Sequence, residues 1–386
     1  TNMMGLNIIR IYGGTVVIHG KRGETTIENF NGEFTSHGST TKVQRLSCSV
    51  GQGSIEISYP VTGPKVEGRI VVRDLQLQDM IALKVPKGMT GPLNIEAVMR
   101  GHVGDMEIVG FMSSPALYMR TEAITDFSSP ITLKDNELVL EKMRGWIGEY
   151  ELRGKMVNDV VTDITDLVIK GGGEGAASGS ILKMLNMQPF ISSSWLDADV
   201  HLWGDLTEFY QFEGDIKLKL RNSTIDFAEI GQGTMKGFPL DRIPEAELHM
   251  TLSEGTLKFK KCDIRSRSLW ISAVGDIIMH YNEEEDRVNR SEFEMDFNTG
   301  CGNLKDLAEQ FGQKNIKIEG NGEGWFRLEA DYENEFHRLN GKGELGFRDV
   351  RVRSIPVGNM GEFEGIVDLK YDSIDTDLFL DKESVG

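Results

Sequence analysis

Hydrophobic and polar residues alternate with a period of two along most of this chain. The pattern is clearest between Ile243 and Met279, where Leu248, Met250 and Leu252 are separated by polar residues. Alternation that is interrupted by Gly-containing turns is typical of antiparallel strands with one apolar face. We therefore predict four short strands in this stretch, with Gly275 punctuating the last of them.

The same alternation recurs roughly every ten residues through the rest of the chain. In the predicted strand 292–297, Phe293, Met295 and Phe297 face one way and acidic residues face the other way. Near the N-terminus, the pair Gly13 and Gly14 separates two predicted strands. Because no helices alternate with these strands, the pattern predicts an all-β fold.

A meander of this length exceeds the ~10 strands that an open twisted sheet reaches before it rolls, stacks or curves. Two short helices interrupt the strands, one over 180–187 before Pro189 and one over 303–310 with Asn303 as its N-cap. We predict an extended, curved antiparallel sheet that forms a groove, capped by these two helices. We divide it into a first groove segment, 1–175, and a second, continuous segment, 176–386.

The alternation also predicts which side chains line the groove. They are the inward-facing positions of the clearest strands in the second segment. The predicted lining residues are Ile216, Leu218, Leu220, Leu248, Met250, Leu252, Leu257, Phe259, Phe293, Met295 and Phe297.

The charge balance narrows the choice of partners. The chain has 386 residues, with 42 Lys and Arg against 60 Asp and Glu, and its formal net charge is −18. Nucleic acids are bound through phosphate contacts from Lys and Arg, so this balance argues against a nucleic-acid partner. It argues equally against peripheral docking on a surface of anionic lipid headgroups.

Neither the cysteines nor the ends of the sequence indicate the cellular compartment of the protein. Cys48, Cys262 and Cys301 are far apart and form no CxxC motif, so neither a disulfide framework nor a zinc site is indicated. No apolar run approaches the ~18 residues of a membrane-spanning helix. The sequence begins at Thr1 without Met, and we expect it to be a segment of a longer protein.

Sequence motifs for catalysis are weak. The Gly-rich run 171–179 follows a strand and precedes a short helix, which imitates a dinucleotide-binding turn. However, Glu174 would place a negative charge where the pyrophosphate lies, and Pro189 stops the helix after about two turns. The seven His residues are dispersed, and neither HExxH nor GxSxG occurs. We predict no catalytic residues, no metal site, no cofactor and no enzymatic activity.

The apolar faces carry the remaining functional signal. The chain holds 17 Met and 18 Phe, which can pack an ordinary sandwich core. They can also line a cavity for flexible acyl chains, since Met adapts to irregular partners. Two short helices are too few to cover so much apolar sheet, so the face must close on itself or be filled by a ligand.

Three stretches between Ser180 and Met279 resemble the AsmA-like superfamily of bacterial envelope proteins (the AsmA, YhdP and TamB type). They are the helix ILKMLNM followed by DADVHLWGDL, the strand GDIKLKLRNSTI, and the strand–turn–strand EGTLKFKKCDIRSRSLWISAVGDI. The segments GPLNIEAVMRGHVGDMEIVG and ITLKDNELVLEKMRGWIGEYELRG in the first half resemble the same repeats more weakly.

The resemblance implies a long β-groove with an apolar interior, anchored in the inner membrane and reaching across the periplasm. It implies a role in transporting phospholipid toward the outer membrane, with phospholipid or another acyl-chain lipid as ligand and envelope proteins at either end. The family's amino-terminal membrane helix is missing here, so the resemblance places the anchor in a segment outside this chain.

Two alternatives stay open at the level of sequence. The same strands could form a closed sandwich in a structural or assembly module of the envelope, similar to the type II secretion N protein. A glycan-acting enzyme on a β-scaffold is the third hypothesis, and the five dispersed Trp residues do not favour it.

Overall fold

The structure is a computed structural model. It describes residues 7–20, 23–37, 40–58, 61–62, 65–80, 89–102, 105–119, 121–162, 164–174, 191–205, 212–225, 243–266, 268–282, 287–310, 317–333, 335–360 and 363–383.

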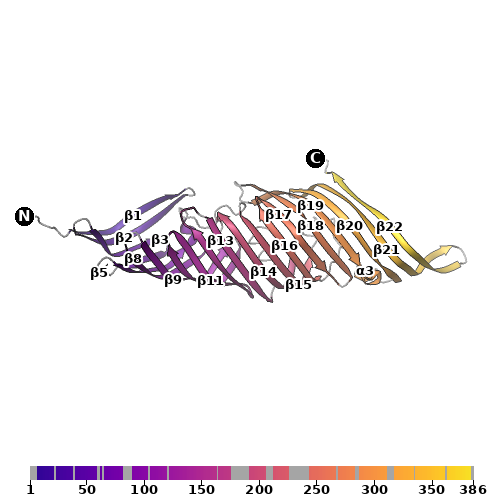
Figure 1. The fold of residues 1–386 in the computed structure, drawn as a ribbon, viewed down its shortest axis with the longest axis horizontal. Helices are drawn as coiled ribbons and strands as arrows, with labels where there is room; N and C mark the ends of the chain where they lie inside the picture. Colours follow the sequence, from indigo (N-terminus) through magenta and orange to yellow (C-terminus); the bar gives the residue numbers. More distant parts are fainter. Residues whose placement is uncertain are drawn as a thin grey trace, which may run out of the picture. The chain divides into compact units, whose positions relative to one another are not determined.

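The described part of the chain consists almost wholly of β-strands (Figure 1). It divides into two compact units, the first built mainly from Thr1–Gly171 and the second mainly from Glu213–Gly386. Strands β13 (Ile164–Glu174) and β14 (Ile191–Asp205) lie around the division.

The first unit is an antiparallel meander in which strands that follow one another along the chain are neighbours in the sheet. Its order is β1-β2-β3-β4-β6-β8-β9-β10-β11-β12, with the short β5 on β6 and the short β7 on β9. Its elements are β1 (Asn7–Gly20), β2 (Gly23–His37), β3 (Thr40–Val50), β4 (Gly53–Ser58), β5 (Val61–Thr62), β6 (Lys65–Gln76), the 3₁₀ turn η1 (Leu77–Asp79), β7 (Met89–Thr90), β8 (Pro92–His102), β9 (Asp105–Met119), β10 (Glu122–Lys134), β11 (Glu137–Ile147) and β12 (Tyr150–Asp159).

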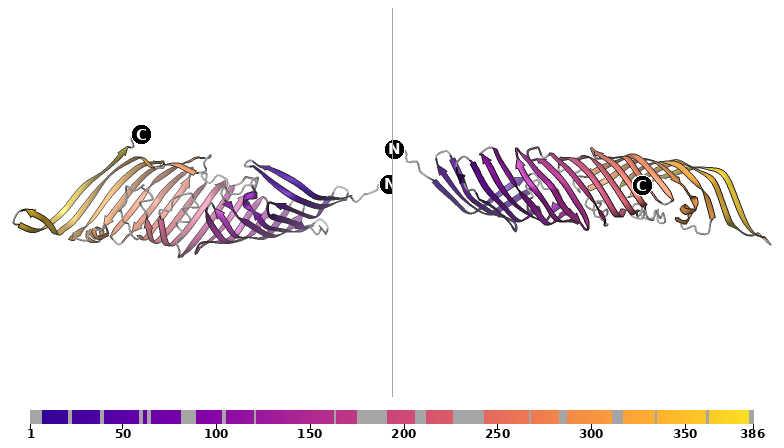
Figure 2. Two further views of the ribbon diagram at one scale, coloured as in Figure 1. Left: turned by 180° about the vertical axis from the view of Figure 1, so that it is seen from behind. Right: turned by 60° about the horizontal axis from the view of Figure 1, so that its bottom comes forward.

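The second unit is also an antiparallel meander, with the order β15-β16-β17-β18-β19-β20-β21-β22. Its long strands curve along their length (Figure 2). Its elements are β15 (Glu213–Ile225), β16 (Ile243–Ser253), β17 (Thr256–Arg265), β18 (Leu269–Asn282), β19 (Arg287–Cys301), the helix α3 (Leu304–Gln310), β20 (Lys317–Glu333), β21 (Glu335–Met360) and β22 (Phe363–Glu383).

These elements confirm the predicted all-β, antiparallel fold class. The predicted helix after Asn303 is also confirmed, because α3 begins at Leu304 and the Asn303 side chain accepts a hydrogen bond from the backbone N–H of Lys305 at 3.0 Å. The other predicted helix, 180–187, lies outside the described residues.

Two predicted strand breaks are wrong, and both fall at glycines. The stretch 243–279 forms three strands rather than four, and Gly275 lies inside β18. A β-carbon there would overlap the carbonyl oxygen of Glu294 on the neighbouring strand, so glycine serves close strand approach at this point. Likewise, Gly13 and Gly14 lie within β1, where the pairing with β2 shifts register at a bulge.

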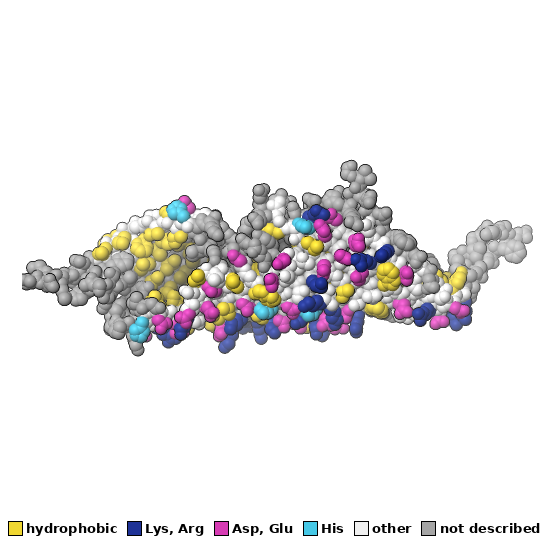
Figure 3. All heavy atoms as spheres, turned by 45° about the horizontal axis from the view of Figure 1, so that its top comes forward, with side chains coloured by type: hydrophobic (Ala, Val, Ile, Leu, Met, Phe, Trp, Pro, Cys, Tyr) yellow, Lys and Arg dark blue, Asp and Glu magenta, His cyan; other side chains and the backbone are white. Residues whose placement is uncertain are grey.

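The apolar core of the first unit is made by neighbouring strands of one sheet. Ala97, Ile131 and Leu140 form one buried cluster, and the residues packed around it come from β6, β8, β9, β11 and β12. A second cluster, centred on Val50 and Val72, is surrounded by residues of β2, β4, β6 and β8 and by Met80 beside η1. In the space-filling view, hydrophobic side chains gather in a hollow of this unit toward its N-terminal end (Figure 3).

Candidate functional site

All eleven predicted lining residues lie on one face of β15–β19 in the second unit, which we call the apolar face. Strand pairing determines this, because residues directly opposite each other in an antiparallel pair project from the same side of the sheet. One cross-strand row contains Ile216, Met250, Phe259, Gly275 and Met295.

Two further rows flank this one on the same face. The first contains Leu218, Leu248, Cys262, Ala273 and Phe297. The second contains Leu252, Leu257, Ile277 and Phe293. Beyond the first of them, Leu220 lies opposite Ala246, which faces Ile264 and then Ile271. The apolar face is therefore continuous across five strands.

The sequence prediction missed the middle of the apolar face. Cys262 and Ala273 are buried there and form a cluster with Met295. Cys262 was missed because the pairing shifts register at a bulge between Phe259 and Cys262, which interrupts the simple alternation. The pair Lys260–Lys261 marks this bulge, because two consecutive lysines cannot belong to a regular alternation.

Burial along the apolar face is uneven. Leu220, Met250, Leu252 and Met295 are at most 8% exposed, and the other seven predicted lining residues are half-buried. The cluster around Cys262 draws on β16, β17, β18 and β19, which are consecutive in the sheet. The described contacts on this face are thus lateral contacts within one layer, unlike the contacts between facing sheets that build a sandwich core.

The helix α3 packs on the same sheet near one end of β19, β20 and β21. Leu304 and Leu307 of the helix join Cys301, Val350 and neighbouring apolar residues of these strands in one cluster. The helix contributes only seven residues. Of the helices that the structure describes in this unit, α3 alone lies against the sheet, so it covers a small part of the apolar side.

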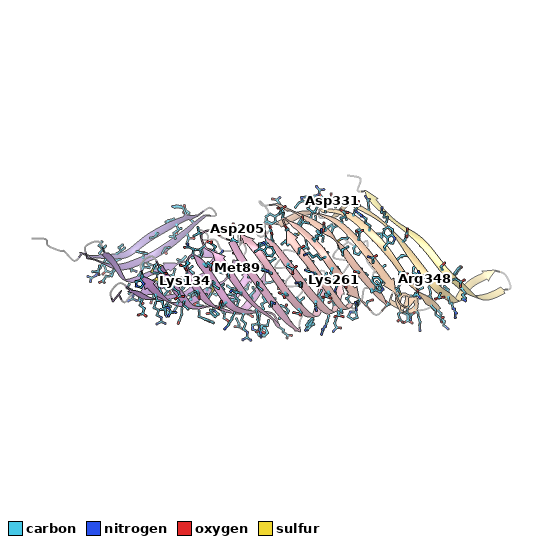
Figure 4. All side chains as sticks on the ribbon, viewed as in Figure 1. Met89, Lys134, Asp205, Lys261, Asp331 and Arg348 are labelled. Carbon is cyan, nitrogen blue, oxygen red and sulfur yellow. The ribbon has the colours of Figure 1, made fainter. Side chains whose placement is uncertain are left out.

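The opposite side of these strands, which we call the polar face, is covered by ion pairs. The Lys261 ammonium lies 2.7 Å from Glu247 Oε2 and 3.4 Å from Asp263 Oδ2. The hydrogen bond from Lys261 holds the pKa of Glu247 below its ordinary value, and the same bond raises the pKa of Lys261. Farther along, Arg290 binds both carboxylate oxygens of Asp331. Figure 4 labels Lys261 and Asp331.

A second group on the polar face joins β15 and β16. Asp215 lies 2.9 Å from the Lys217 ammonium and 2.6 Å from Nε2 of His249. Partial burial acts to raise the pKa of Asp215, but the hydrogen bonds from Lys217 and His249 outweigh it and the net shift is downward. These groups neutralise one another, which is the arrangement expected of a solvent-facing side.

No group of three or more His, Cys, Asp or Glu side chains within the described ranges could hold a metal ion. The Gly-rich run begins within β13, and Gly171 there packs against the ring of Tyr150, where a β-carbon would approach the Tyr150 Oη to 2.6 Å. The rest of the imitated dinucleotide turn, from 175 on, lies outside the described residues.

Comparisons of the chain with protein-family models, with curated proteins and with solved structures found no match. Among the described residues, no helix is long and apolar enough to span a membrane. What the chain binds is therefore inferred from its two chemically different faces.

Proposed function

We propose that the apolar face binds the acyl chains of phospholipid, and that the chain is a segment of a groove that transfers lipid across a bacterial envelope. The observation that carries this proposal is the apolar face, which forms a single layer among the described residues. Its rows of Leu, Ile, Met and Phe continue across five strands, while their described contacts come from lateral neighbours. The resemblance to the AsmA-like superfamily supports the envelope setting.

The physical benefit of such a face is large. An acyl chain in water loses about 0.8 kcal/mol for each CH₂ group that is exposed, so a chain of about 16 carbons is held back by more than 10 kcal/mol. A continuous apolar surface removes most of that barrier without any catalytic group. The half-buried side chains of this face, such as Phe259 and Phe293, keep apolar surface that an acyl chain can contact.

The first test is mass spectrometry of an organic extract of the purified protein after gel filtration. We expect phospholipid to remain with the protein at a stoichiometry of one or more. A folded, monodisperse protein without lipid would contradict the proposal. It would favour the alternative, in which this sheet is a structural or assembly module of the envelope.

A second test places lipid at the apolar face directly. A photo-crosslinking phenylalanine analogue at Phe259 should form adducts with lipid, whereas the same analogue at Lys258 should not, because these neighbours project from opposite faces of β17. Equal labelling from both positions would mean that lipid adsorbs without regard to face. Neither substitution replaces a fully buried side chain, because Phe259 is half-buried and Lys258 is exposed.

The third test blocks the face with charge. Leu218→Asp combined with Met250→Asp should abolish lipid retention, because two carboxylates would lie where acyl chains bind. The matched control is Val274→Asp with Ile278→Asp, which puts two carboxylates on exposed aliphatic positions of the polar face. Circular dichroism of both proteins separates loss of binding from loss of fold.

A further inference from the structure

Two exposed tryptophans lie one strand apart on the polar face of the second unit. Trp270 of β18 is directly opposite Gly300 of β19, and Trp325 of β20 is directly opposite Asn298 of the same strand (Figure 1). Both indoles project from the side opposite Phe297, which belongs to the apolar face. Strand spacing and rise put their β-carbons roughly 12 Å apart. Strand pairing thus brings together two aromatic residues that are distant in the sequence.

Each of the two indoles is held by a contact of its own. Trp270 is 44% exposed, and its ring packs against Gly300, where a β-carbon would lie only 2.3 Å from Nε1. Glycine at this position therefore lets the ring lie close to the backbone of β19. Trp325 is 38% exposed, and its Nε1 donates a hydrogen bond to Glu344 Oε2 at 3.2 Å. Rings that are already positioned reduce the entropy cost of binding a ligand.

A polar row runs between the two rings. Asn298 is exposed on β19, the strand that separates Trp270 from Trp325. Its amide offers hydrogen-bond donors and an acceptor. The next residue of this row on β18 is Ser272, whose hydroxyl donates to Asp263 Oδ1 at 2.8 Å. A ligand that lies across the three strands would meet an aromatic ring at each end and an amide between them.

An open pocket of about 500 Å³ adjoins Trp270 at the ends of β17 and β18. This volume is in the range of sites for small molecules. Its lining includes Trp270 and three further side chains of the polar face, Asp263, Arg265 and Ser272. The other lining residues come from the same strand ends, the turn between them and Gly302. Trp270 therefore belongs both to the tryptophan pair and to a recess with carboxylate, guanidinium and hydroxyl groups.

Charges of both signs surround the tryptophan pair. Glu323, which is directly opposite Gly300 on β20, lies 3.2 Å from the Arg348 guanidinium. Arg265 has Glu245 directly opposite on β16. Such a mixture is complementary neither to a polyanion nor to a polycation. The surface instead suits an uncharged ligand that has apolar sides and many hydroxyl groups.

We propose that the polar face binds an uncharged, β-linked oligosaccharide across Trp270 and Trp325. A pyranose ring has C–H groups on its flat sides and hydroxyls around its edge. The C–H sides stack on the indoles, and Asn298 and the polar residues of the pocket bond the hydroxyls. A protein partner fits less well, because the core of a protein interface is depleted of charged residues. This site lies on the side of the sheet opposite the apolar face and does not depend on acyl binding.

The test is calorimetric titration of the protein with cellotetraose and chitotetraose, two uncharged β-1,4-linked tetrasaccharides. The unsubstituted protein should bind at least one of them. Trp270→Ala and Trp325→Ala should each weaken that binding by about three- to ten-fold, the size expected for one stacked aromatic pair. Trp270→Phe should keep most of the affinity, because it retains an aromatic ring.

The matched control is Trp203→Ala, because Trp203 on β14 is also 38% exposed but lies outside the pair. This substitution should leave sugar binding unchanged, and circular dichroism should show that all variants are folded. An equal loss of affinity in Trp203→Ala would contradict a site at the tryptophan pair.

Three further results would overturn the proposal. One is failure of the unsubstituted protein to bind either tetrasaccharide, and another is full affinity in both alanine variants. The third is binding to phosphatidylcholine vesicles that depends on Trp270 and Trp325, without affinity for the sugars, which would assign the rings to a lipid–water boundary. None of these results bears on acyl binding, since every variant leaves the apolar face unchanged.

Discussion

The N-terminal strand of the first unit and the central strands of the second unit carry the same alternation but bury it very differently. Ile9 on β1 is 53% exposed, whereas Met295 on β19 is 8% exposed. On β1, Arg10 pairs with Glu33 from the opposite side of the strand, so Ile9 and Ile11 project from the apolar side. The difference in exposure therefore does not come from a difference in pattern.

This difference in exposure shows which neighbours bury a side chain in the sheet. Met295 has strands on both sides, with Gly275 on β18 and Leu328 on β20 directly opposite. In the described pairing, Ile9 has a neighbour on one side only, Phe34 on β2. In the single layer that the described residues form, lateral neighbours supply most of the cover, so a residue's distance from the sheet edge decides how well it is buried.

The largest expected difference in stability is between an aspartate at Met295 and an aspartate at Ile9. Met295→Asp should lower the free energy of unfolding of the second unit by about 3 kcal/mol or more, because a carboxylate would lose its hydration. Ile9→Asp should cost the first unit less than about 1 kcal/mol, because the side chain stays in water. Urea unfolding of both variants measures the difference. Equal costs would mean that something other than lateral neighbours covers the two positions.

Substitutions to a larger side chain should give a smaller difference in stability between the two regions. Ala273 is almost fully buried among Cys262, Met295 and their neighbours, so Ala273→Leu should destabilise the second unit by about 1–3 kcal/mol. Ile11→Phe on β1 should be nearly neutral, since that side chain is already partly in solvent. Thermal unfolding midpoints distinguish the two. A neutral Ala273→Leu would indicate free space above the apolar face at its centre.

The alkylation rates of thiols compare how accessible side chains are in the same two regions. Burial, assisted by nearby Asp263, raises the pKa of the Cys262 thiol to about 11. At pH 8 its thiolate fraction should be on the order of 100-fold below that of an ordinary thiol with a pKa near 8.5. A cysteine introduced by Ile9→Cys should therefore alkylate at least that much faster, as peptide mass spectrometry can measure. Comparable rates would show that Cys262 is accessible.

The raised pKa of Cys262 also predicts how the stability of the fold changes at alkaline pH. The folded state binds the Cys262 proton more tightly than the unfolded state does. Its contribution to stability is therefore fully present below the ordinary thiol pKa of about 8.5 and is lost as the pH rises toward about 11. Cys262→Ala should reduce this alkaline loss, and an unchanged pH profile would contradict the assignment.

The smallest effects are expected on the solvent-facing sides. A double-mutant cycle of Glu247 and Lys261 should give a coupling of about 0.2–1 kcal/mol, and so should a cycle of Arg10 and Glu33, because both pairs are solvent-exposed. The pKa of Glu247 is lowered by Lys261, so its coupling should be present at neutral pH and lost as the pH falls through the folded pKa. Coupling above about 2 kcal/mol would contradict this interpretation of the polar face.

The sequence by itself determined the fold class, the α3 helix and the facing of the eleven apolar positions. A period of two assigns a strand residue to one side of a sheet without reference to any distant residue. The Asn303 cap is equally local, since its side chain bonds a backbone N–H two residues on. What these positions bind stays a prediction.

Only the tertiary structure decided the centre of the apolar face and the strand boundaries at glycines. Cys262 reaches the centre because a bulge after Phe259 shifts the register, and Gly275 continues its strand because Glu294 of the neighbouring strand lies so close. Alternation records the side on which a residue lies, whereas register and neighbours across the sheet decide what surrounds it.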